Sequence, residues 1–278
     1  ANSTPPNFGE PPVPQPEPST NTLFTLAEAN IPGADPLSRP SEFDQVLNPF
    51  VGGAFVTGME ASLGGIAPMA ILELRSGEIL VSGGADRGSI YIFDREGGEA
   101  LSERLLAAPG APIFNLAEDS DGNIWATTGG GALLKIDAAT GGVVARYGDG
   151  ITMGLAIEAE TGLIYVGTNS GVSTFDPVSG KFTQWSRDEN LRVGSLAFDD
   201  YGVLWAVTWP DRRQVVSFTD RQRAEARLTF DSDIDSIAFG KKGSDLADLM
   251  FVSHNSGSSL STGEIIGGSD LTMVDLET

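Results

Sequence analysis

Apolar residues in this chain come in short alternating runs that recur at a nearly constant interval. Five segments each hold an apolar run, a turn rich in Gly or Asp, and a second apolar run: residues 68–84, 113–129, 152–168, 193–209 and 234–255. One column of this repeat holds Leu72, Ala117, Ala156, Ala197 and Ala238, separated by 45, 39, 41 and 41 residues. Runs such as IYIFD and LLKID alternate with the period of two that is typical of β-strands.

A third apolar run follows in each unit, and fourth strands are predicted at residues 102–107, 142–147, 181–186 and 224–230. Four short strands at a period near 40 residues are typical of a β-propeller blade. No segment shows a helical stripe, and no unit has room for a crossover helix. The sequence therefore predicts an all-β fold, a β-propeller with about five four-stranded blades. The blades should lie near residues 61–108, 111–148, 151–187, 191–230 and 233–278.

The two ends of the chain depart from this repeat. Ten of the sixteen prolines fall in residues 1–40, so residues 1–41 are predicted to be a Pro-rich linker or extended arm, and residues 42–278 the propeller. The fifth unit ends with its third strand at LTMVDLET. We therefore expect either a fragment of an incomplete six-bladed ring, or a ring that residues 42–60 close by supplying a missing strand. An open ring would leave strand edges that invite association.

Composition and charge argue against several classes of function. The formal net charge is −21, which disfavours binding to nucleic-acid phosphates. The chain has no cysteine, which excludes disulfides, thiolate nucleophiles and Cys-based zinc sites. No apolar run approaches the roughly 18 residues that span a bilayer.

The turn from Asp119 to Asn123 is the one segment that looks like half of a calcium loop. The equivalent turns read RSGE, AETG and DDYG, and only this one carries Asp-x-Asp. An EF-type loop needs a Glu eleven residues after its first Asp, but that position is Gly130. We therefore interpret the turn as structural and expect no cofactor, with bound Ca²⁺ as the alternative. The residues that this alternative would use are Asn115, Asp119, Asp121 and Asp235.

Two stretches resemble known propellers. NLAEDSDGNIWATTGGGALLKID and SLAFDDYGVLWAVTW resemble blades of bacterial regulator-type and streptogramin-lyase-like propellers. The longer series LNPFVGGAFVTG, YGDGITMGLA, LWAVTWPDRRQVVSFTD and SDIDSIAFG resembles a propeller segment of very large bacterial repeat proteins with Ig-like or RTX-adhesin repeats. This resemblance covers roughly residues 40–278. It implies an extracellular or cell-surface protein whose partners are other chains, or other domains of the same large polypeptide. It gives no catalytic residues to carry over.

The loops after the second strand of each blade hold the candidate ligand-binding residues, because such loops recur on one face of a propeller. The candidates are Asp86, Arg87, Asn169, Trp209, Asp211, Arg212, Arg213, His254 and Asn255. Arginine can bind carboxylate or phosphate with two parallel hydrogen bonds, and tryptophan can stack on a sugar or an aromatic ligand. The structural alternative is that Asp86 and Asp211 neutralise their neighbouring arginines and that Trp209 packs against the next blade.

Three functions remain open at this stage. The sequence favours a non-catalytic module of a large exported protein that acts as a scaffold, adhesion or protein-interaction surface. The first alternative is a propeller that binds a small molecule or glycan on one face. The second is a metal-dependent hydrolase or lyase, which the single histidine, His254, and the missing Ser-His-Asp set disfavour.

Overall fold

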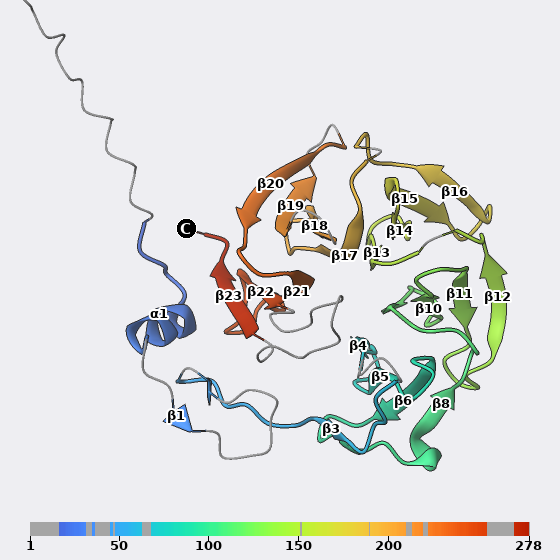
Figure 1. The fold of residues 1–278 in the computed structure, drawn as a ribbon, viewed down its shortest axis with the longest axis horizontal. Coiled ribbons are helices and arrows are strands. Elements are labelled where there is room, and N and C mark those ends of the chain that lie inside the picture. Colours follow the sequence, from blue (N-terminus) through green and yellow to red (C-terminus); the bar gives the residue numbers. More distant parts are fainter. Residues whose placement is uncertain are drawn as a thin grey trace, which may run out of the picture.

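The computed structural model describes residues 17–31, 35–36, 45–46, 48–62, 68–150, 152–188, 190–209, 213–218, 222–254 and 270–277. Within them, antiparallel sheets are arranged around a central axis as a five-bladed β-propeller, which confirms the predicted fold (Figure 1). The described residues include no helix long and apolar enough to cross a membrane.

Four blades contain four strands each. Blade 1 consists of β4 (Ala70–Glu73), β5 (Ile79–Gly83), β6 (Ser89–Phe93) and β8 (Leu105–Ala107). Blade 2 consists of β9 (Asn115–Glu118), β10 (Ile124–Thr127), β11 (Leu133–Ile136) and β12 (Val143–Tyr147). Blade 3 consists of β13 (Leu155–Ile157), β14 (Ile164–Thr168), β15 (Gly171–Asp176) and β16 (Lys181–Gln184). Blade 4 consists of β17 (Val193–Phe198), β18 (Leu204–Thr208), β19 (Gln214–Phe218) and β20 (Ala224–Thr229).

Blade 5 has three strands in the part of the chain that the structure describes. They are β21 (Ile234–Phe239), β22 (Leu249–His254) and β23 (Asp270–Asp275), in that order from the axis outward. All pairs within the five blades are antiparallel; β22 and β23, for example, align Leu249 with Asp275 and Ser253 with Leu271.

Apolar side chains between neighbouring blades form the core. Blades 1 and 2 share one buried cluster, as do blades 2 and 3, blades 3 and 4, and blades 4 and 5. Aromatic contacts cross these interfaces; the ring of Trp125 lies 5.5 Å from that of Phe175, and the ring of Tyr165 lies 5.2 Å from that of Phe198. Alternation along each strand therefore produces the core, since the side chains on both faces of a blade point into an adjoining blade.

Blades 5 and 1 are joined in another way. Lys241, in the connection between β21 and β22, forms an ion pair with Glu73 at the end of β4. This hydrogen-bonded lysine is the main reason why the pKa of Glu73 lies below its usual value. The buried clusters described above include none that joins these two blades.

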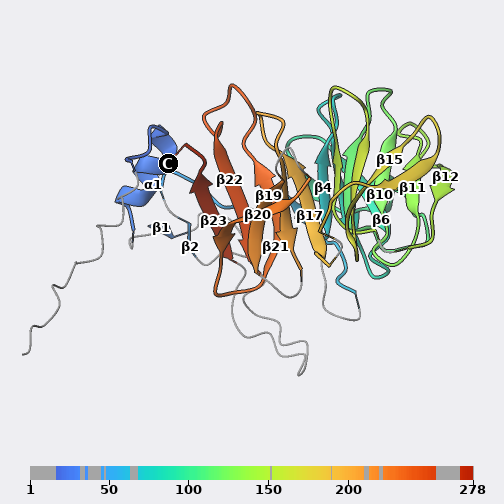
Figure 2. The same cartoon turned by 90° about the horizontal axis from the view of Figure 1, so that it is seen from above.

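The N-terminal segment contains a helix, α1 (Thr22–Ala29), although the sequence led us to expect an extended arm. Asn21 caps this helix, because its side chain accepts hydrogen bonds from the backbone N–H groups of Leu23 and Phe24. The helix lies beside blade 5 at the edge of the disc (Figure 2). After it come two short strands that pair with each other, β1 (Asp35–Pro36) and β2 (Gln45–Val46).

The next strand, β3 (Val56–Thr57), lies in the segment that was predicted to close the ring. It pairs in parallel with β7 (Gly98–Glu99), which follows β6 of blade 1. The ring of Phe55 lies 5.9 Å from that of Phe93 in the same blade. Residues 48–62 therefore do not supply the missing strand to blade 5. They attach to blade 1 instead, because the backbone N–H groups of Gly98 and Ala100 donate hydrogen bonds to the carbonyl oxygens of Phe55 and Thr57.

Candidate functional site

The turn that resembled a calcium loop is held together by its own first residue. Asp119 is nearly buried, and its Oδ1 accepts hydrogen bonds from the backbone N–H groups of Asp121 and Asn123 at 3.0 and 2.9 Å. Its Oδ2 accepts one from the indole nitrogen of the fully buried Trp125 at 2.8 Å. Burial alone would raise the pKa of Asp119, but hydrogen bonds from Trp125, Asn123 and Asp121 outweigh burial and lower it.

Blade 4 repeats this arrangement. Asp199 Oδ1 accepts hydrogen bonds from the backbone N–H groups of Tyr201 and Val203. Its Oδ2 accepts one from the indole nitrogen of Trp205, at the same 2.8 Å as in blade 2. The pattern Asp, then Gly three residues later and Trp six residues later therefore describes a turn that is locked to the following strand.

The other metal candidates lie apart from this turn. Asn115 begins β9, whereas Asp119 follows the end of that strand, and Asn115 Oδ1 accepts a hydrogen bond from the adjacent Leu116 N–H. Asp121 is exposed in the turn. Asp235 lies on the innermost strand of blade 5, where solvent still reaches it but the surrounding protein desolvates it and raises its pKa. No group of three or more His, Cys, Asp or Glu side chains in the described residues could hold a metal ion.

The candidate loops of blades 1 and 3 form tight turns. Asp86 accepts a hydrogen bond from the backbone N–H of Gly88 at 2.9 Å, and the Arg87 carbonyl accepts one from the Ile113 N–H at 2.8 Å. Asn169 is exposed in the turn between β14 and β15. In blade 4, Trp209 is 37% exposed. Asp211, Arg212 and Asn255 lie outside the described residues.

The structure brings two of the candidates, Arg213 and His254, to one connection. Arg213 forms an ion pair with Asp233 at 2.6 Å and donates to the carbonyl of Asp231. His254 is buried; its Nδ1 is hydrogen-bonded to Ser232 Oγ at 2.7 Å and its Nε2 to Thr272 Oγ1 at 2.8 Å. Both side chains therefore stabilise the link between β20 and β21.

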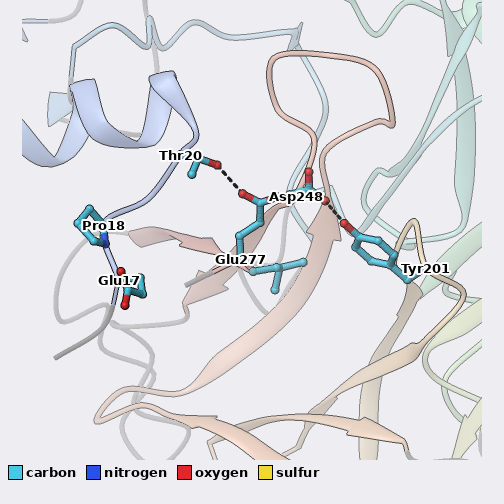
Figure 3. Close-up of a pocket in the computed structure, with 7 residues that line it drawn as sticks. Glu17, Pro18, Thr20, Tyr201, Asp248 and Glu277 are labelled. Carbon is cyan, nitrogen blue, oxygen red and sulfur yellow. Dashed lines mark hydrogen bonds between the residues drawn. The ribbon is translucent and has the colours of Figure 1, made fainter. Parts of the chain in front are cut away.

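A second site lies away from the loops that hold the predicted ligand-binding residues. Two adjacent hollows of about 460 and 510 Å³ lie between the N-terminal segment and blades 4 and 5, and we call them the N-terminal groove. Figure 3 shows the residues that line the first of them. Their lining residues are Glu17, Pro18, Thr20, Asn21, Thr22, Leu23, Tyr201, Ser244, Asp245, Ala247, Asp248, Leu276 and Glu277. These residues include four carboxylates and no basic side chain.

Hydrogen bonds attach the N-terminal segment, which forms one wall of this groove, to blade 5 and to the chain after β23. Thr20 Oγ1 donates to Glu277 at 2.5 Å (Figure 3). Asn21 Nδ2 donates to the carbonyl oxygens of Asp245 and Ala247 at 3.3 and 3.2 Å. Asn21 thus caps α1 with its oxygen and binds the backbone of blade 5 with its nitrogen.

Tyr201 reaches the groove from blade 4. Its hydroxyl donates to Asp248 Oδ1 at 3.0 Å, and this hydrogen bond, together with the negative charge of Asp248, raises the pKa of Tyr201 (Figure 3). The groove is therefore an acidic surface, and one of its walls is a segment of the chain that ends in the first residues of α1.

Comparisons with known proteins agree with this class of fold. The family described as two component regulator propeller matches residues 108–130, which contain the Asp119 turn and Trp125. A search of curated proteins gave no match. The chain is similar in structure to virginiamycin B lyase from Staphylococcus aureus, with a TM-score of 0.52 and 16% identity, over 76% of this chain and 71% of that one.

Two further solved structures are similar to the same extent. A luciferin-regenerating enzyme has a TM-score of 0.56 and 16% identity, over 75% of this chain and 78% of that one. A gluconolactonase from Xanthomonas campestris has a TM-score of 0.52 and 14% identity, over 66% of this chain and 68% of that one. At such identities the likeness shows the β-propeller fold alone.

Proposed function

We propose that this propeller is a non-catalytic protein-interaction module of an exported bacterial protein, and that its N-terminal groove binds polypeptide. One observation carries the proposal: residues 17–23 of the chain itself dock against blade 5, partly through hydrogen bonds to its backbone, and form one wall of the groove. A surface that binds one segment in this way can bind a similar segment of another chain. The resemblance to segments of giant surface proteins supports the exported location.

The use of the polar side chains also favours this proposal over catalysis. Asp119, Arg213 and His254 each make several hydrogen bonds that hold a turn or a connection in place. In the lyase from Staphylococcus aureus, a variant with one histidine replaced by alanine is catalytically inactive. The single histidine of the present chain is buried between Ser232 and Thr272.

A peptide-binding experiment tests the proposal. The probe is a fluorescent peptide of residues 17–31, and the receptor is the full-length Asn21→Ala variant, in which the chain's own segment is held less tightly. We expect saturable binding of the probe, and no binding of a control peptide that carries Asn21→Ala itself. Failure of the probe to bind would show that the groove is not a peptide-binding surface.

An enzyme assay tests the alternative. The protein is incubated with a sugar lactone and with virginiamycin B, each with and without added Ca²⁺ or Mg²⁺. We expect no turnover above buffer. Turnover that disappears in a folded His254→Gln variant would contradict the non-catalytic assignment.

A further inference from the structure

The connection between the first two strands of blade 5 departs from the repeat. In blades 1 to 4 this connection has five or six residues: 74–78, 119–123, 158–163 and 199–203. In blade 5 it has nine, residues 240–248, and we call it the blade 5 loop. Four residues of this loop line the N-terminal groove: Ser244, Asp245, Ala247 and Asp248. The loop that breaks the repeat is therefore also the loop on which the N-terminal segment docks.

Hydrogen bonds within the blade 5 loop fix its backbone. The Lys241 carbonyl accepts hydrogen bonds from the backbone N–H and from the hydroxyl of Ser244, at 3.0 and 2.7 Å. The Ser244 carbonyl in turn accepts one from the Ala247 N–H at 3.0 Å. Gly240 allows the loop to fold this tightly, because a Cβ there would lie 1.7 Å from the carbonyl oxygen of Leu246. The loop therefore presents a preorganised backbone surface.

Two carbonyl groups of this loop accept hydrogen bonds from one side chain. Asn21 Nδ2 donates to the carbonyl oxygens of Asp245 and Ala247 at 3.3 and 3.2 Å. Oδ1 of the same side chain accepts from the N–H groups of Leu23 and Phe24 at 3.0 and 3.1 Å and so caps α1. A carboxamide has two N–H donors and an acceptor oxygen, so a single asparagine serves both the helix and the loop.

Other residues that cap helices can perform only part of this role. Aspartate caps a helix as well as asparagine does, but its ionised carboxylate has no N–H group to donate. In place of Asn21 it would set a negative oxygen against the carbonyl oxygens of Asp245 and Ala247. Neighbouring carboxylates would add to this repulsion; they belong to Glu17, Asp245, Asp248 and Glu277. Serine also caps, but it offers one donor where the asparagine amide offers two.

The residue before the asparagine adds a contact of its own. Thr20 Oγ1 donates to the carboxylate of Glu277, which follows β23, at 2.5 Å (Figure 3). An ionised carboxylate only accepts hydrogen bonds, so this position requires a donor, which a threonine or serine hydroxyl supplies. Thr20 and Asn21 thus place neighbouring side-chain donors against two parts of blade 5.

We propose that the blade 5 loop selects polypeptide partners in which an asparagine caps a short helix and a threonine or serine stands directly before it. The inference rests on the proposed function and names the partner class for the same surface. The helix presents the asparagine in one orientation, and the preorganised loop binds its amide group without rearranging. A partner with aspartate at this position is rejected, although it forms the same helix.

The experiment separates helix capping from recognition with three fluorescent peptides of residues 17–31. One is unchanged, one carries Asn21→Asp and one carries Asn21→Ala. Aspartate keeps the cap and loses the donor, whereas alanine loses both. The receptor is the full-length Asn21→Ala variant, and fluorescence anisotropy measures binding. We expect the Asn21→Asp peptide to lose about tenfold or more in affinity, as the Asn21→Ala peptide does. Circular dichroism should show equal helix content for the unchanged and Asn21→Asp peptides.

Salt controls for the charge that aspartate adds. In about 1 M NaCl the Debye length is about 3 Å, so general repulsion between the peptide and the acidic groove is largely screened. We expect the weaker binding of the Asn21→Asp peptide to persist, because a missing hydrogen-bond donor does not depend on salt. A difference that disappears in salt would overturn the proposal.

Matched changes in the receptor test the loop itself. Ser244→Ala removes the hydroxyl that bonds the Lys241 carbonyl, so it should weaken binding of the unchanged peptide about threefold. Ser76→Ala changes an exposed serine in the equivalent connection of blade 1 and should leave binding unchanged. Equal binding by these two receptors would contradict a role for the loop.

The remaining outcomes separate this inference from the proposed function. If the unchanged and Asn21→Asp peptides bind equally well, the surface accepts any capped helix, and the inference fails while the proposed function stands. If none of the three peptides binds, both fail. If the wild-type protein is a dimer that Asn21→Asp separates, a second copy occupies the surface and the partner class is wrong.

Discussion

The hydrogen bonds of Asp119 allow a quantitative test of how the blades are held together. The substitution Asp119→Asn keeps the size of the side chain but leaves one acceptor oxygen in place of two. At present Oδ1 serves the backbone of Asp121 and Asn123, and Oδ2 serves the indole of Trp125. The asparagine can keep only one of these roles. Because Trp125 is fully buried, water cannot replace the lost acceptor.

The expected cost follows from this geometry. A buried N–H without a partner costs about 1–3 kcal/mol, so we expect Asp119→Asn to lower the free energy of unfolding by about 2 kcal/mol. For a chain of this size that corresponds to a fall of about 5 °C in Tm. Asp199→Asn is the matched control. It removes the equivalent acceptor of Trp205, but both side chains are partly exposed, so a loss of about 1 kcal/mol is expected.

The pH dependence gives an independent check. The pKa of Asp119 is lower in the folded protein than in the unfolded chain, so its ionised form contributes stability above the unfolded value near 4. This contribution is lost as the pH falls through the folded pKa. The difference in Tm between wild type and Asp119→Asn should therefore be largest at neutral pH and shrink below about pH 4.

Thermal denaturation followed by far-UV circular dichroism from pH 3 to 7 measures both effects. The reasoning is refuted if Asp119→Asn and wild type melt together at pH 7. It is also refuted if the two variants, at Asp119 and at Asp199, lose the same stability.

Three further predictions concern the backbone and the groove. Gly141 has φ +68°, and a Cβ there would lie 1.8 Å from a carbonyl oxygen of β8. Gly202 has a similar φ of +79° but open space around it, so Gly141→Ala should lower Tm more than Gly202→Ala. Parallel thermal melts of the two variants measure this difference. Asn21→Ala should speed limited proteolysis within residues 17–31, because it removes the helix cap and two bonds to blade 5. Ultraviolet titration should place the pKa of Tyr201 above the usual tyrosine value, and Asp248→Asn should lower it.

The fold could be predicted from the sequence because each blade repeats the same pattern of apolar strand residues and polar turn residues. The alternation of apolar residues sets the strands, and turns such as Asp199–Gly202 set the spacing between them. The structural interpretation of the Asp119 turn agrees with its hydrogen bonds, since short polar side chains in such turns bond the neighbouring backbone.

The groove could not be predicted, because it depends on contacts between distant parts of the chain. Thr20 and Glu277 are 257 positions apart, and the eight-residue helix α1 is too short for a clear helical period to appear in the sequence. The candidate site was predicted in the loops after the second strands instead, because these loops are rich in Asp, Asn and Arg. In the described loops, Asp86 bonds the backbone two residues later, which is the commoner role of such residues in turns, and Arg213 bonds the backbone of the connection between β20 and β21.

The N-terminal segment also contributes to closure of the ring between blades 5 and 1. Neighbouring blades share buried clusters from blade 1 through blade 5, whereas in the described residues an ion pair between Lys241 and Glu73 links blade 5 back to blade 1. Solvent surrounds this pair, so it contributes little to stability. The N-terminal segment contacts both blades, through Asn21 on blade 5 and β3 on blade 1. Once either contact has formed, the other forms within a single chain at high effective concentration. A segment fixed at both ends can therefore resist opening of the ring where the ion pair alone cannot, and the same segment forms one wall of the groove in which we place recognition of polypeptide.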